Sequence, residues 1–538
     1  MSTDDAQHRT SQFAAPGAQA GPATGPVGGF AGFGASQDIL AASPDEPSGR
    51  KAPWLLVAGV AALVLALIGG VTYGAAQLSG GGSQPEDALP SGAFGFLKVD
   101  LDPPAGQKVD GFRFMRKFPA LREQLGDGDD LRRVVFEAVA DGAGWSDVDF
   151  DAEVAPWMGR RIGVGAYPPP ENSPVPVPGA VVALQVTDGG AAEKGLARLT
   201  SALPGGAAPG YVVTGDYALL AATQQLADRA AADAEDGVLA SDATLAADLA
   251  AAGDGIMAAW VDLGRATESL GQAATALGGG LGVLGAPAGG ATGRSTYVAR
   301  FAGPDVFEVT GTATSRETAG WETSGVTGME TLPESSVVAF GLAGGDALVR
   351  SVYDSVRTAV DEAPGVAAGP SFDEMVAAAE KELGIEVPDD LAALLGDNLL
   401  VALDGSDRGS LDVGARLSTD VTRAERVLDV LEKTAKSDIP VIRERAGDDL
   451  VLATTPKQAE RMAATGSLGD RAGFRESLPD LGDADLALWV DVNGVVGALL
   501  DDLGDGSPDE NLEPIDGVGV TVSSGGDDTT FRVRLVTH

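Results

Sequence analysis

The chain contains the segment GDYALLAATQQLADRAAA at Gly215–Ala232 and a second version of it, GDDLVLATTPKQAERMAA, at Gly447–Ala464. Nine of the eighteen residues are identical, and the alignment needs no gap. Another pair follows in the same order, GDGIMAAWVDLG at Gly253–Gly264 and GDADLALWVDVN at Gly482–Asn493. Two ordered matches, 232 and 229 positions apart, predict a duplicated domain, because each copy is long enough to bury a core of its own.

Both copies predict the same succession of strands and helices. The predicted strands of the first copy and their equivalents in the second copy are 93–101 and 336–342, 159–167 and 398–403, 180–187 and 411–417, and 306–312 and 530–536. A helix follows the third strand in each copy, at 191–203 and 422–435, and Ser371 and Glu374 form a capping box ahead of a helix that Gly384 can end. Consecutive strands joined by short turns pair antiparallel, so we expect an α+β protein with two antiparallel sheets, one per copy, and helices packed on their faces.

One uncharged segment predicts where the protein resides. WLLVAGVAALVLALIGGVTY, Trp54–Tyr73, is twenty residues long and, as a helix, would span about 30 Å of hydrocarbon. Arg50 and Lys51 precede it, so the positive-inside rule places the N-terminus in the cytoplasm and the C-terminal region outside the cell. A cleaved signal peptide is the alternative, but some fifty residues precede the segment and its apolar run is too long for that class.

These features give the predicted domain organisation. The parts are a disordered, Gly/Pro/Ala-rich cytoplasmic tail (1–51), a transmembrane helix (52–78), a flexible linker (79–87), repeat 1 (88–318), a second linker (319–330) and repeat 2 (331–538). The fold prediction is therefore two tandem homologous α+β repeats that follow one transmembrane helix. The localisation prediction is a single-pass protein of the cell membrane with an extracellular C-terminal domain.

Composition excludes several functions. The formal net charge is −41, which repels phosphate backbones, so we expect no nucleic-acid partner. The acids are spread along the chain, as on a solvated surface. The chain has no cysteine, and its two histidines, His8 and His538, lie at the chain ends. No Ser-His-Asp, Cys-His or zinc-ligand constellation can be assembled, and we expect no cofactor and no metal.

The remaining motifs are weak. Gly280, Gly282 and Gly285 fit GxGxxG, but no strand precedes them and no acidic residue follows at the distance that dinucleotide binding requires. The acidic run DDLGDGSPDE, 501–510, fails the EF-hand pattern because leucines occupy two ligand positions. GDGDD at 126–130 is better explained as a turn that caps the next helix.

Carboxylates are the only candidates left for chemistry. Asp100 and Asp102 are two apart on a predicted strand and would project to one face, as a paired-acid site requires. Acids at the solvent-exposed end of a strand are the simpler interpretation. Asp262 and Asp491 each follow a Trp-Val strand and precede a helical pattern, where a helix N-cap is expected. We assign no catalytic residue, and Trp260 is expected, like Trp489, to anchor a core.

The segment PEDALPSGAFGFLKVDLDPPAGQK, Pro85–Lys108, resembles the actinobacterial domain of unknown function 3352 family. FRFMRKFP at Phe112–Pro119 and APWMGRRIGVG at Ala155–Gly165 strengthen the resemblance. It implies a membrane-anchored extracytoplasmic protein, but the family has no established activity or catalytic residues to transfer.

Two function classes follow from these patterns. The first is a non-catalytic module of the cell envelope that binds a protein partner, a lipid or a wall component, or serves a structural role. The alternative is an envelope hydrolase that depends on carboxylates, and two acids facing each other in a cleft would favour it. The absence of cysteine and the position of both histidines at the chain ends favour the first class.

Overall fold

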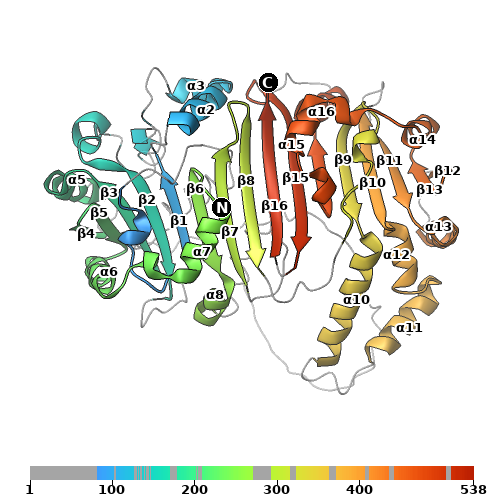
Figure 1. Ribbon diagram of the computed structural model, residues 1–538, viewed down its shortest axis with the longest axis horizontal. Coiled ribbons are helices and arrows are strands. Elements are labelled where there is room, and N and C mark those ends of the chain that lie inside the picture. Colours follow the sequence, from blue (N-terminus) through green and yellow to red (C-terminus); the bar gives the residue numbers. More distant parts are fainter. Residues whose placement is uncertain are drawn as a thin grey trace, which may run out of the picture. The chain divides into compact units, whose positions relative to one another are not determined.

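The computed structural model describes most of the chain beyond residue 81 (Figure 1). The described residues are 82–101, 105–125, 130, 132–133, 136–137, 140, 145, 147–169, 179–201, 203, 209–270, 293–314, 323–362, 371–405, 411–435, 441–503, 510–526 and 528–538. The predicted tail, the predicted transmembrane helix, Asp102 and the GxGxxG glycines lie outside them. Among the described residues, no helix combines the length and the apolar character needed to cross a bilayer.

All strands in the described part of the chain pair antiparallel within one sheet. The first eight are β1 (Gly95–Asp100), β2 (Met158–Tyr167), β3 (Gly179–Val186), β4 (Gly210–Thr214), β5 (Tyr217–Ala221), β6 (Met257–Asp262), β7 (Arg294–Phe301) and β8 (Val306–Thr314). The others are β9 (Ser336–Ala343), β10 (Asn398–Gly405), β11 (Leu411–Ser418), β12 (Ile442–Ala446), β13 (Asp449–Ala453), β14 (Leu486–Val490), β15 (Ile515–Gly525) and β16 (Asp528–Thr537). Their spatial order is β12-β13-β11-β10-β9-β14-β15-β16-β8-β7-β6-β1-β2-β3-β5-β4.

The α+β class and the antiparallel pairing are confirmed, but the expectation of two separate sheets is wrong. β8 and β16 pair along their length, from Val306 opposite Val536 to Thr314 opposite Asp528. Each of these strands would otherwise form the edge of its own eight-stranded sheet, with unpaired backbone N–H and C=O groups. Pairing satisfies both edges and joins the strands into one sheet.

The strands β9–β16 follow one another across the sheet in the same order as β1–β8. Local hydrogen bonds match too: the Leu239 N–H donates to the Leu89 carbonyl, and the Leu468 N–H donates to the Leu332 carbonyl. At the centre of the β8–β16 ladder, Thr310 lies opposite Arg532. We call β1–β8 with their helices the first half and β9–β16 with theirs the second half.

Helices and short helical turns connect the strands. In the first half they are η2 (Pro85–Asp87), α2 (Ala105–Met115), α3 (Pro119–Leu125), η3 (Phe150–Val154), α5 (Gly189–Ser201), α6 (Gln224–Asp236), η4 (Leu239–Ser241), α7 (Ala243–Ala252) and α8 (Leu263–Leu270). In the second half they are η5 (Met329–Thr331), α10 (Gly345–Glu362), α11 (Phe372–Leu383), α12 (Asp389–Leu395), α13 (Val421–Ala435), α14 (Pro456–Ala463), η7 (Leu468–Asp470), α15 (Ala472–Ser477), η8 (Leu481–Asp483) and α16 (Val492–Leu503). The predicted capping box of α11 is confirmed, and Gly384 ends that helix in a left-handed conformation.

The two predicted tryptophan anchors are confirmed as core residues. Trp260 is 2% exposed in β6, and Trp489 is fully buried in β14. They occupy matching positions, because Trp260 lies opposite Phe96 of β1 and Trp489 lies opposite Ala339 of β9. Trp260 donates its indole N–H to Asp248 at 2.8 Å. The Trp489 ring instead packs against Phe474, with 5.6 Å between ring centroids.

Residues 82–87, which the sequence predicts to be part of a flexible linker, are packed against the sheet. Pro85 lies over Gly163 of β2, where a Cβ atom would come within 2.3 Å of the Pro85 Cβ. The Ser83 carbonyl accepts hydrogen bonds from the Tyr217 hydroxyl at 2.9 Å and from Arg161 at 3.0 Å. Glu86 forms an ion pair with Lys98 of β1. The first half therefore holds the chain from Gly82 onward.

The two outer strands of the sheet are protected in different ways. On β4, the Gln224 side chain accepts a hydrogen bond from the Tyr211 N–H at 3.2 Å and donates one to the Tyr211 carbonyl at 3.0 Å. β12 instead carries charged side chains at Arg443, Glu444 and Arg445, which disfavour the addition of another strand.

Candidate functional site

The predicted helix caps are confirmed at both copies of the Trp-Val-Asp motif. Asp262 accepts a hydrogen bond from the Arg265 N–H at 2.9 Å, and Asp491 accepts one from the Gly494 N–H at 2.8 Å. Each carboxylate also pairs with a guanidinium, that of Arg265 and that of Arg471 respectively. These are structural roles, because the contacts occupy both aspartates at the start of α8 and α16.

Asp100 does not lie at a solvent-exposed strand end, as the simpler interpretation expected. Its residue is 3% exposed, and its carboxylate pairs with the Arg161 guanidinium of the neighbouring strand at 3.1 Å. The alternation of burial along β1 places Asp100 on the same face as Phe96 and Lys98, beneath residues 82–87. The segment that packs over this face encloses the ion pair.

Five carboxylates in the described part of the chain are buried: Asp100, Glu308, Asp390, Asp404 and Asp485. Four of them face a guanidinium, as Asp404 does with Arg461 at 3.2 Å. Asp485 accepts hydrogen bonds from the Ser524 N–H and the Thr323 hydroxyl instead. Burial of a charge without such partners would cost several kcal/mol, and these contacts offset that cost.

Glu308 joins the two halves electrostatically. It lies in β8, between Arg300 of β7 and Arg534 of β16, and its carboxylate meets their guanidinium groups at 2.8 and 2.7 Å. Arg532 approaches the same carboxylate at 3.4 Å. Burial by itself would raise the Glu308 pKa, but the hydrogen bonds from Arg300 and Arg534 outweigh it, and the pKa is lowered.

Asp390 has a similar environment at the start of α12. The side chain is fully buried and accepts hydrogen bonds from the Glu386 N–H at 2.8 Å, from Arg423 at 2.6 Å and from Arg426 at 2.5 Å. Burial alone would raise its pKa, but the Glu386 N–H and the two guanidinium groups lower it below its usual value. Asp390 thus fixes α12 to α13.

A polar pocket of about 540 Å³ opens beside this ion pair, among α10, α12, α13 and the β12–β13 turn. Its acidic lining residues are Asp346, Asp389, Asp397, Asp420, Asp448 and Asp449. Arg350 and Arg423 line it as well, and both of their guanidinium groups lie near Asp389, at 3.3 and 3.8 Å. The volume falls in the range of small-ligand sites. We call it the α12–α13 pocket.

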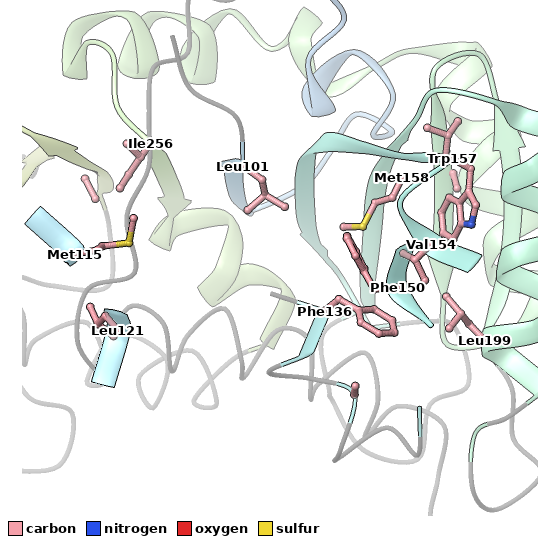
Figure 2. Close-up of a cluster of buried hydrophobic side chains, with 14 of the residues drawn as sticks. Leu101, Met115, Leu121, Phe136, Phe150, Val154, Trp157, Met158, Leu199 and Ile256 are labelled. Atoms are coloured by element: carbon pink, nitrogen blue, oxygen red, sulfur yellow. The ribbon is translucent and has the colours of Figure 1, made fainter. Parts of the chain in front are cut away.

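The corresponding place in the first half, where α5 follows β3, holds the buried side chain of Trp157. Asp188 follows β3 and caps α5, as Asp420 follows β11 and caps α13. Trp157 lies against α5, so that a Cβ on Gly195 would come within 2.2 Å of its indole nitrogen. Trp157 belongs to a hydrophobic cluster of the first half. Figure 2 shows it with four other buried side chains of that cluster, Phe136, Phe150, Val154 and Leu199. The pocket is thus a local difference between two similar frameworks.

The α12–α13 pocket offers carboxylate acceptors, guanidinium donors and the hydroxyl groups of Ser418 and Thr419. Such a lining suits a polar ligand that carries hydroxyl or ammonium groups. Within the described ranges, no group of three or more acidic or histidine side chains is placed to hold a metal ion. The sequence pattern did not identify this pocket, because its residues come from four separate segments.

Comparison with protein-family models, with curated proteins and with solved structures finds no match to this chain. The resemblance to the domain of unknown function 3352 family therefore stays a prediction.

Proposed function

We propose that this protein is a single-pass, membrane-anchored module of the cell envelope that binds a partner or ligand outside the cell and performs no chemical step. The observation that carries the proposal is the state of the buried carboxylates. Those of Glu308 and Asp390 are held by guanidinium groups, and their pKa values are lowered. A general acid needs the opposite, a pKa raised toward the working pH. Fixed ion pairs of this kind support a scaffold.

We also propose that residues 88–318 and 331–538 are two copies of one ancestral domain. The matched strand order, the matched Leu239 and Leu468 hydrogen bonds and the matched tryptophans support this interpretation. In the β8–β16 ladder, Thr310 lies opposite Arg532, and the strands run antiparallel, as expected where two similar units meet across a pseudo-twofold axis. The α12–α13 pocket, found in the second half, is the proposed binding place for a polar envelope component.

The absence of a chemical step can be tested with the full chain. We expect no turnover on glycosidase, peptidase and esterase substrates, with or without divalent cations, because the buried carboxylates are already engaged. Reproducible turnover that disappears in a folded Asp100→Asn or Asp102→Asn variant would support the alternative, a carboxylate-dependent hydrolase. Thermal unfolding of each variant, measured in parallel, separates loss of a catalytic group from loss of the fold.

The membrane orientation predicts the outcome of proteolysis on intact cells. Protease added outside should remove the mass beyond Ser79 and leave the N-terminal tail protected, because Arg50 and Lys51 hold that end in the cytoplasm. Antibodies against tags at the two chain ends provide the readout, and a cytoplasmic enzyme reports cell integrity. Survival of the C-terminal tag until the cells are lysed is the result that contradicts the proposed topology.

A further inference from the structure

A second pocket, of about 300 Å³, lies beside Lys98 in the first half. Glu86 and Asp87 of η2 line one side, and Leu245 and Leu249 of α7 line the other. Lys98 points into it from the middle of β1, and its side chain is only 8% exposed. We call it the Lys98 pocket.

The buried ion pair in the Lys98 pocket leaves hydrogen-bonding capacity unused. The Lys98 ammonium has three N–H donors, and Glu86 Oε1, at 2.5 Å, is its partner. The other carboxylate oxygen, Glu86 Oε2, is buried and has no hydrogen-bond partner within the described residues. A buried acceptor without a donor is destabilising, and more so when it is charged. The pair therefore has an unused acceptor at Glu86 Oε2 and unused N–H donors at Lys98.

The second half shows the same framework with the pocket filled. Gly341 lies two residues after Ala339, as Lys98 lies two residues after Phe96, and a Cβ on Gly341 would come within 2.4 Å of Val326. Met329 precedes Leu332 by three residues, as Glu86 precedes Leu89, and Met329 is fully buried. Phe474 and Leu478 follow Leu468 at the same sequence separations at which Leu245 and Leu249 follow Leu239. The side chains of Phe474 and Leu478 are both buried. An apolar core is thus compatible with this framework, and the first half has a charged pair and a pocket instead.

The walls of the Lys98 pocket indicate the chemistry of its occupant. Leu245 and Leu249, with two alanines of α7, form an apolar side, and Asp87 and Asp254 place two further carboxylates around the pocket. The acids outnumber the single lysine, so the pocket favours an ammonium group that can donate N–H bonds to Glu86 Oε2. The occupant also needs an oxygen atom, a few ångströms from its ammonium group, that accepts a hydrogen bond from Lys98. It needs aliphatic carbon as well, to pack against α7. An O-substituted ethanolamine has these three features.

We propose that the Lys98 pocket binds an ethanolamine phosphate group, with the ammonium at Glu86 and the carboxylates around it, the phosphate oxygens at Lys98 and the carbon skeleton along α7. The proposal rests on the proposed duplication and membrane anchor. Only eight residues separate Tyr73, the last residue of the uncharged segment, from Gly82, and they reach at most about 30 Å. The pocket would therefore lie close to lipid head groups. A free ethanolamine phosphate has the same chemistry, and the experiment separates the two sources.

The test is calorimetric titration of the full chain in detergent with dihexanoyl phosphatidylethanolamine and its choline analogue. The choline group has the same charge but no N–H, so the ethanolamine lipid should bind about tenfold tighter or more. Free phosphoethanolamine forms the second arm: weaker binding than the lipid identifies a lipid head group, and equal binding identifies a soluble ligand. Equal affinity for the ethanolamine and choline lipids, or no binding at all, overturns the proposal.

A double variant, Glu86→Met with Lys98→Met, connects the binding to this pocket. It replaces the ion pair with apolar side chains, as Met329 does in the second half, so the fold should persist with a similar unfolding midpoint. Affinity for the ethanolamine lipid should fall at least about tenfold. Lys117→Met with Asp305→Asn removes another ion pair and should leave binding unchanged. Undiminished binding in the Glu86/Lys98 variant overturns the assignment, whereas the protease test of the membrane topology is independent of this result.

Discussion

Replacing Glu308 with alanine is expected to lower the free energy of unfolding by about 3–5 kcal/mol. The change leaves the guanidinium groups of Arg300, Arg532 and Arg534 close together without the carboxylate that holds them, at the junction of the two halves. Urea denaturation at pH 7, followed by tryptophan fluorescence, gives the measurement. Glu235→Gln is the matched control, because Glu235 is exposed on α6 and its loss should change stability by no more than about 0.5 kcal/mol.

The same variant should also lose part of the acid sensitivity of the fold. The Glu308 pKa lies below its ordinary value of 4.5 in the folded protein, so its contribution is fully present above the unfolded pKa. That contribution disappears as the pH falls through the lowered folded value. The difference in stability between wild type and Glu308→Ala should therefore shrink on acidification below about pH 4. A difference that stays constant from pH 7 to pH 3 would contradict the assigned ion network.

Replacing Trp489 with alanine should cost about 3–5 kcal/mol of unfolding free energy, the range for loss of a buried aromatic side chain. The ring is fully buried, packs against Phe474 and is covered by Arg471, whose guanidinium carbon lies 4.7 Å from the ring centroid. Thermal and urea unfolding of the purified full chain measure the effect.

Two controls make the Trp489 result specific. Trp260→Ala should cost a similar amount, because Trp260 occupies the matching position in β6. Val413→Ala, at a side chain that is 38% exposed, should cost far less. A small effect of Trp489→Ala beside a large effect of Trp260→Ala would show that the two tryptophans have different structural roles and would weaken the proposal of a duplication.

Local sequence signals predicted the secondary structure well. The strand 336–342 lies within β9, the helix 422–435 lies within α13, and the Ser371 capping box begins α11 as expected. Each signal depends on residues that are near one another in the chain: alternation for the strands, apolar spacing for the helices and short side-chain hydrogen bonds for the caps. The N-caps at Asp262 and Asp491 were predictable for the same reason.

Contacts between distant segments were not predictable from the sequence. Nothing in the pattern of β8 or β16 specifies that Thr310 meets Arg532, so the single sheet was missed. The burial of Asp100 depends on residues 82–87 folding back over the sheet, although their composition is typical of a linker. The two pockets have the same origin, since their lining comes from segments far apart in the sequence. Contacts between distant segments, rather than local secondary-structure propensity, determine these features.

The protected outer strands have a consequence for the behaviour of the protein at high concentration. A sheet this wide would normally grow when copies of the protein are concentrated on a surface, because each free strand can template another. Gln224 occupies the backbone groups of Tyr211 on β4, and Arg443 and Arg445 make a second β12 an unfavourable neighbour. Copies of the protein can therefore reach high local density without pairing edge to edge into fibrils.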